Sequence, residues 1–224
     1  SGSFLDKIVE GLLVLLPPAA LLGPWAGSGR VFGYRILVVL LVGCAVTGWI
    51  YPIWVRRFSR AACAIVVVAV AWAVTGVVGA MRLGPRRDLS SLMGAGLALA
   101  GAWSVARLIS DRHIRRERAL RDVAIGWAVA VWVGAPLAVW EILTARHLGT
   151  YADGAWRNHP GLYRQPATWL TNPNLYAVFL AVGSVWVGVV GVRSATRWVR
   201  IAAIATAVTG LGLLLATDSR IVYA

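Results

Sequence analysis

The chain contains few charged residues, and very few of them are acidic. Only 14% of its 224 residues are Asp, Glu, Lys or Arg, and 9 of them are acidic. A soluble domain of this length carries roughly a quarter charged residues. The low charge therefore excludes an ordinary water-soluble globular domain.

Cysteine is also scarce, and the common metal-binding and nucleotide-binding motifs are missing. The two cysteines, Cys44 and Cys63, lie in or beside apolar runs and are typical of small buried hydrophobic residues rather than of a disulfide or metal site. The sequence has no Asp-x-Asp pair, no His-Glu-x-x-His, no glycine-rich phosphate loop and no nucleophile elbow. We therefore expect no metal and no cofactor, and glycosyl transfer through a metal held by Asp-x-Asp is not supported.

What the chain has in abundance is apolar sequence, with 59% hydrophobic residues. Several charge-free runs of roughly 20 residues are long enough to cross the bilayer core as helices and too long for barrel strands. We predict an all-α polytopic membrane protein, a bundle of about seven transmembrane helices plus the start of an eighth. The predicted spans are residues 8–24, 36–55, 61–80, 89–109, 123–145, 173–192 and 201–217.

These spans divide the chain into four parts. Residues 1–3 resemble a cloning remnant, and residues 4–145 hold the first five spans. Residues 146–171 form a polar external loop, and residues 172–224 hold the last two spans and the start of an eighth. Because the chain stops just after a polar cluster, we expect it to be the N-terminal part of a larger protein.

The net charge of +13 comes from basic residues in the loops. Such an excess sets membrane topology and meets anionic lipid headgroups, so we predict membrane lipids and no nucleic acid as partners. With a cytoplasmic N-terminus, 13 of the 22 Lys and Arg residues lie inside, including a dense cluster in residues 107–121. The 146–171 loop then lies outside with 9 arginines on that face. They would attract either lipid headgroups or an anionic substrate such as a diphosphate.

An Asn-Pro-Asn element, residues 172–174, begins the apolar run that follows the polar loop. Asn caps helix N-termini, and Pro is favoured at the first helical position. The element is thus a capped helix start. The same free N–H groups and positive dipole end also suit a phosphate, and the sequence leaves both interpretations open.

Other polar groups near the outer face are candidates for chemistry. Arg220 follows Ser219 in a polar cluster between apolar runs, where an arginine either snorkels to the interface or serves a site. His159 is either a general base or an ordinary loop histidine. Glu141 is the one acid well inside an apolar run. We expect it to pair with Arg146 or with an arginine from another helix.

Two of these elements together resemble a known family. Residues 164–180 carry an arginine, then Asn-Pro-Asn, then an Ala- and Leu-containing helix, and Ser-Arg-Ile follows about one span later at residues 219–221. This pattern resembles the hallmark of the O-antigen ligase and O-antigen polymerase superfamily, membrane glycosyltransferases of the C type. Trp169 and Thr171 replace the small residues usual before Asn-Pro-Asn, and Ile221 replaces a glycine. Elsewhere the chain matches only as a generic helical bundle.

The resemblance implies a metal-independent, inverting transfer of a glycan from undecaprenyl diphosphate. The acceptor would be a hydroxyl of a glycan, lipid or protein at the outer face of the bacterial cytoplasmic membrane. The family's arginines hold the diphosphate, and in its ligases the proposed base is a histidine in a large external loop, which would lie beyond residue 224. The substrate-binding candidates from the motifs and the preceding loop are Arg220, Arg164, Asn172, Asn174, Ser219 and Arg157.

Two other classes of protein remain open. A transporter or flippase of lipid-linked or other anionic solutes would use the outer arginines as a vestibule, with prolines such as Pro136 breaking its helices. A non-catalytic membrane scaffold would need only close helix packing, which the small residues of the fourth span permit.

Overall fold

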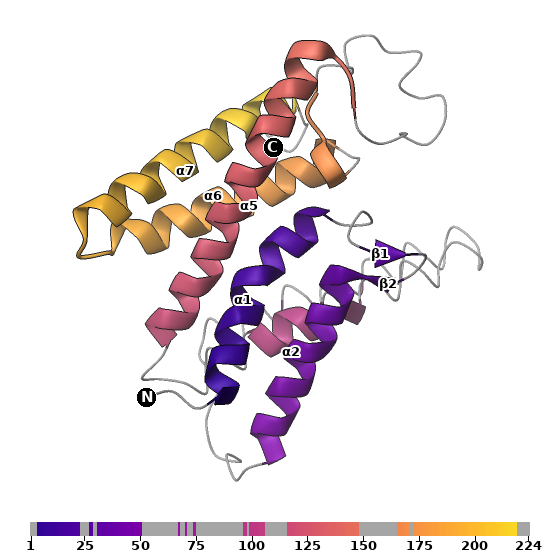
Figure 1. Ribbon diagram of the computed structural model, residues 1–224, viewed down its shortest axis with the longest axis vertical. Helices are drawn as coiled ribbons and strands as arrows, with labels where there is room; N and C mark the ends of the chain where they lie inside the picture. Colours follow the sequence, from indigo (N-terminus) through magenta and orange to yellow (C-terminus); the bar gives the residue numbers. More distant parts are fainter. Residues whose placement is uncertain are drawn as a thin grey trace. The chain divides into compact units, whose positions relative to one another are not determined.

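A computed structural model describes about three fifths of the chain, and its described residues are mainly helical (Figure 1). They are residues 4–22, 27–28, 31–50, 67, 70, 74, 96–97, 99–105, 116–147, 165–170 and 173–218. The helices are α1 (Phe4–Leu22), α2 (Gly33–Ile50), α5 (Arg116–Thr144), α6 (Pro173–Val192) and α7 (Arg197–Ala216), with a 3-10 turn η3 (Thr168–Leu170). A two-residue antiparallel ribbon of β1 (Gly27–Ser28) and β2 (Val31–Phe32) pairs Gly27 with Phe32, a small departure from the all-helical prediction.

Three helices in the described part of the chain are long and apolar enough to cross a membrane. They are Glu117–Thr144, Leu175–Val192 and Arg197–Ala216, and Gly33–Ala45 is a shorter apolar helix. The chain therefore has the helices of a membrane protein, as predicted. The predicted span 173–192 coincides with α6. The predicted spans 61–80 and 89–109 and the start of an eighth helix fall largely or wholly outside the described residues, so the seven-helix bundle remains a prediction.

The chain forms two compact units. The first comprises Ser1–Leu13 and Arg35–Leu120, and the second comprises Val14–Tyr34 and Arg121–Ala224. In the first unit α2 lies against the short described stretch 99–105, where a Cβ added at Gly101 would meet the Val38 side chain at 3.4 Å. The second unit holds α6, α7 and the part of α5 from Arg121 onward, together with all of the polar contacts described below.

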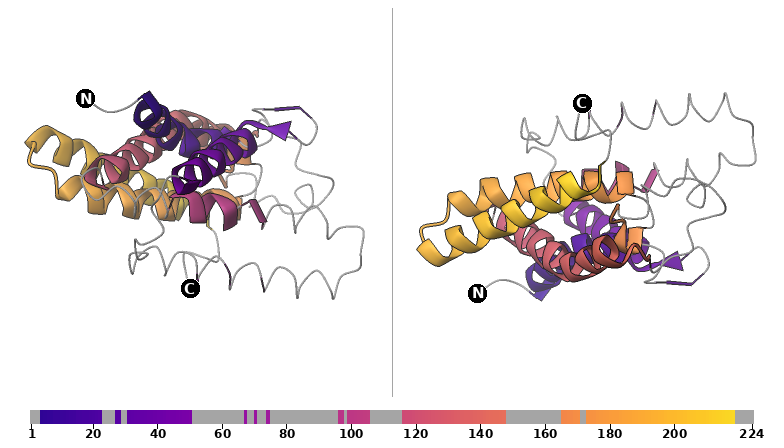
Figure 2. Two further views of the ribbon diagram at one scale, coloured as in Figure 1. Left: turned by 90° about the horizontal axis from the view of Figure 1, so that it is seen from below. Right: turned by 90° about the horizontal axis from the view of Figure 1, so that it is seen from above.

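The core of the second unit forms where α5 packs on α6 and α7. α6 and α7 run side by side as an antiparallel hairpin, and α5 crosses it (Figures 1 and 2). Side chains from all three helices and the end of α1 share one apolar cluster. Its buried members are Leu21, Ala130, Val131, Ala135, Ala138, Tyr176, Phe179, Leu180 and Leu213.

Close approaches between these helices depend on small residues and one hydrogen bond. Trp132 Nε1 of α5 donates to Thr206 Oγ1 of α7 at 2.9 Å. The Trp127 and Phe179 ring centroids lie 4.4 Å apart, and Gly183 leaves room for the indole. Each contact holds α5 against the hairpin, whose ends carry the polar groups of interest.

Candidate functional site

A buried carboxylate lies at the end of α5. Glu141 occupies the last turn of this membrane-length helix, and its side chain is 0% exposed. A buried charge costs several kcal/mol unless it is paired and hydrogen-bonded. An ionisable residue within a membrane span is a candidate functional residue, and the groups that contact it indicate its role.

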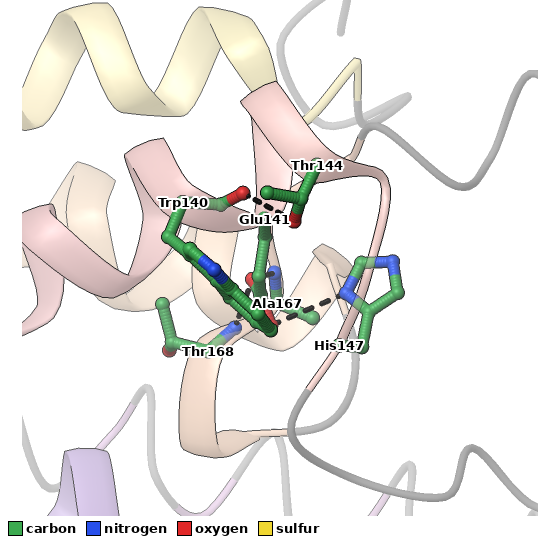
Figure 3. A network of polar contacts seen from close by, with 6 residues as sticks. All are labelled: Trp140, Glu141, Thr144, His147, Ala167 and Thr168. Carbon is green, nitrogen blue, oxygen red and sulfur yellow. Dashed lines mark hydrogen bonds and ion pairs between the residues drawn. The ribbon is translucent and has the colours of Figure 1, made fainter.

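The first partners of Glu141 are two consecutive backbone N–H groups. Its Oε2 accepts hydrogen bonds from the N–H of Ala167 at 2.8 Å and of Thr168 at 2.9 Å (Figure 3). Successive N–H groups that converge on one anion form a concave anion-binding nest. Thr168 adopts φ 51°, a left-handed conformation that is uncommon for a β-branched residue and costs about 1–3 kcal/mol. The carboxylate stabilises this strained turn from within.

The second partner is His147. Its Nδ1 lies 3.2 Å from Glu141 Oε1, and its side chain is only 10% exposed. Figure 3 shows the second ring nitrogen pointing away from Glu141. Oε2 is thus hydrogen-bonded, whereas Oε1 makes this close contact but accepts no hydrogen bond within the described part of the chain.

This pairing corrects the partner expected for Glu141. An arginine was expected, but Arg146 is exposed and the histidine six residues after Glu141 takes the place instead. The helix closes with the Ala145 N–H donating to Glu141 O at 2.9 Å, and Ala145 then adopts φ 53°. This left-handed residue turns the chain back and brings His147 to the carboxylate. Glycine normally marks such a turn, so an alanine gave no signal in the sequence.

The anchored segment leads directly into the Asn-Pro-Asn element. After Thr168 the chain forms η3, whose Trp169 and Leu170 pack against the core cluster, and α6 begins at the buried Pro173. α6 therefore begins at this proline as predicted, whereas the expected capping residue Asn172 lies outside the described residues. Trp169 therefore has a structural role through its partial packing on the core.

Tyr176 lies one turn into α6 and faces the same region. It is 1% exposed, and its hydroxyl has no hydrogen-bond partner within the part of the chain that the structure describes. The hydroxyl lies beside Gly134 of α5 and within electrostatic reach of Glu141. A Cβ added at Gly134 would lie 3.2 Å from the hydroxyl oxygen, so the glycine makes room for it.

Most site residues predicted from the motifs lie outside the described residues. These are Arg157, His159, Arg164, Asn172, Ser219 and Arg220. Asn174 is described as part of the first turn of α6. α7 runs antiparallel to α6, so it ends at the same end of the second unit, and residue 218 directly precedes the predicted Ser-Arg pair.

From the sequence, Glu141 was expected to pair with an arginine, and neither its contact with His147 nor its link to the motif was predicted. The structure connects both to the segment that enters α6. Among the described residues no group of three or more His, Cys, Asp or Glu is placed to hold a metal ion. The site therefore consists of an enclosed acid, a histidine and a strained turn at the start of α6.

Comparisons with known proteins add no assignment to this picture. No family model matches the chain, and neither curated proteins nor solved structures give a significant match. The resemblance to the ligase and polymerase superfamily accordingly rests on the motif residues alone.

Proposed function

We propose that the protein transfers a glycan from undecaprenyl diphosphate to an acceptor hydroxyl at the outer face of the bacterial cytoplasmic membrane. The observation that carries this proposal is the entry of α6. There the Asn-Pro-Asn element follows a segment fixed by two hydrogen bonds to a fully enclosed Glu141. A buried charge at one end of three membrane-length helices favours a functional site over a simple helix connection.

The proposed chemistry needs no metal and divides into three roles. The acceptor hydroxyl attacks the anomeric carbon with inversion, and the bond from this carbon to the diphosphate oxygen breaks. A base takes the hydroxyl proton, and arginines stabilise the charge on the departing diphosphate. Arg220 and Arg164 are assigned to the diphosphate on the motif resemblance. His159 is the base candidate of the sequence analysis, with the family's base expected beyond residue 224.

The test is transfer of a radiolabelled undecaprenyl-diphosphate glycan by membranes that contain the full-length protein. Arg220→Ala and Arg164→Ala are expected to keep normal expression and lose most of the transfer. Arg193→Ala, at the exposed turn between α6 and α7, is the matched control and keeps it. Full transfer by both site variants would remove the two arginines from the site. No transfer by the wild type across a panel of lipid-linked donors would overturn the function itself.

One observation favours a second candidate, a proton-coupled transporter of anionic solutes. Glu141 and His147 form a buried acid and histidine pair at the end of a membrane helix, and such pairs occur in proton relays. Solute uptake by proteoliposomes that depends on an imposed pH gradient, without glycan transfer, would favour the transporter. Transfer without uptake favours the enzyme.

A further inference from the structure

We infer that Glu141 is a positioning residue for the donor site: its carboxylate holds the chain that enters α6 through the Asn-Pro-Asn element. This inference rests on the proposed function. It assigns no chemistry to the carboxylate, because Glu141 is 0% exposed and both of its oxygens already face protein groups. Its effect on the reaction therefore passes through the backbone that it holds.

The geometry makes Glu141 a link between distant parts of the chain. The two hydrogen bonds join Glu141 to residues 26 and 27 positions later in the sequence. Their donors, Ala167 and Thr168, lie five and four residues before Asn172. The segment is also held by the buried side chains of Pro166, Ala167 and Thr168 and by the partial packing of Trp169 and Leu170 on the core. Loss of the carboxylate would leave two buried N–H donors unpaired, each at a cost comparable to a lost hydrogen bond.

The length and shape of the side chain matter more than its charge for this role. A glutamine offers an amide oxygen at the same distance along the side chain, which accepts from both N–H groups. An aspartate is shorter by one methylene, about 1.5 Å, and its carboxylate falls short of the nest. A positioning role therefore predicts that Glu141→Gln is mild and that Glu141→Asp and Glu141→Ala are severe. If the carboxylate instead acted as an acid or a base, Glu141→Gln would be severe.

An apolar side chain at residue 141 would leave the N–H groups of Ala167 and Thr168 without the acceptor that they have in the structure. The strained φ of 51° at Thr168 also points to a conformation that is imposed on the segment rather than preferred by it. Release of Thr168 from Glu141 is expected to relax this turn and let the start of α6 move.

The experiment measures the position of that helix start directly. Leu143 and Leu175 are 76% and 57% exposed, and each is replaced by a spin-labelled cysteine in the full-length protein in lipid, after Cys44 and Cys63 are changed to serine. Pulsed electron resonance gives the distance distribution between the ends of α5 and α6. The distribution is compared for wild type, Glu141→Gln, Glu141→Asp and Glu141→Ala. Glu117→Gln, an exposed acid at the other end of α5, is the matched control.

Transfer of the radiolabelled donor is measured on the same preparations. The inference expects a broadened or shifted distribution in the alanine and aspartate variants, with the KM for donor raised about tenfold or more, as for loss of one buried hydrogen bond. Glutamine and the Glu117 control stay within about threefold of wild type. An unchanged distribution in Glu141→Ala would overturn the link, and a changed distribution with normal transfer would overturn the positioning role. Absence of transfer by the wild type would reject the proposed function, while the distances would still decide whether Glu141 holds the segment.

Discussion

Glu141 Oε1 and His147 Nδ1 lie 3.2 Å apart, although the two residues are separated by more than a helical turn and by the end of α5. The pair holds the residues that follow α5 against the last turn of that helix. Together with the hydrogen bonds from Ala167 and Thr168, it gathers both ends of the 146–171 loop at one carboxylate. The loop that separates the fifth and sixth helices is therefore fixed at both of its ends.

The first prediction concerns His147. His147→Gln should lower the stability of the protein by about 1 kcal/mol, because it replaces the ionisable group that faces a buried carboxylate. Arg146→Gln, the neighbouring exposed side chain, is the matched control and should change stability by less than about half of that. Thermal unfolding in detergent measures both. Equal stability of the two variants would show that the short distance contributes nothing to folding.

The second prediction concerns the packing of α6 on α7. Gly191 lies so close to Ala203 that a Cβ at this position would collide with the Ala203 Cβ, which has no rotamer to escape into. Gly191→Ala should therefore separate the hairpin locally and cost about 1–3 kcal/mol. Gly188→Ala is the same change on the same helix, where the nearest atom, Ala207 Cβ, lies at an ordinary 3.7 Å. Unfolding in mixed micelles should show a loss for residue 191 only, and equal losses at both positions would contradict the hairpin contact.

The third prediction concerns the hydrogen bond between α5 and α7. Trp132 Nε1 donates to Thr206 Oγ1 at 2.9 Å, while the same hydroxyl donates to Ala202 O at 2.8 Å. The threonine thus uses its single proton along its own helix and accepts the indole proton. A double-mutant cycle of Trp132→Phe and Thr206→Val should give a coupling of about 0.6 kcal/mol and no more than about 1.7. A coupling of zero would show that this hydrogen bond does not stabilise the packing of α5 on α7.

The fourth prediction concerns orientation. Arg193 lies in the turn between α6 and α7, and Arg197 is the first residue of α7. Because basic loops face the cytoplasm, this turn should be cytoplasmic. A single cysteine at Ala195, after Cys44 and Cys63 are removed, should react with an impermeant maleimide only when the cytoplasmic side is open. A cysteine at the exposed Arg146 should react from the outside. The opposite pattern would invert the topology and place the proposed site inside.

The local features of this protein follow from its sequence. Long charge-free runs predict helices that cross a membrane, and a proline after a polar loop together with a basic residue after Val192 gives both bounds of α6. α5 instead begins at Arg116 rather than at residue 123, because arginine, glutamate, alanine and leucine extend the helix beyond the apolar run. Such features depend on residues within a few positions of one another, so a single sequence is sufficient to predict them.

The partners of Glu141 depend on contacts that no local pattern encodes. They need a left-handed alanine at residue 145, a strained threonine at residue 168, and the return of a segment 26 residues away to the end of α5. Sequence alone identified an isolated acid within a membrane span and expected an arginine beside it. The tertiary structure decided that backbone N–H groups and a histidine enclose it instead. A buried charge must find its partners wherever packing brings them, and packing depends on the whole unit rather than on neighbours in the sequence.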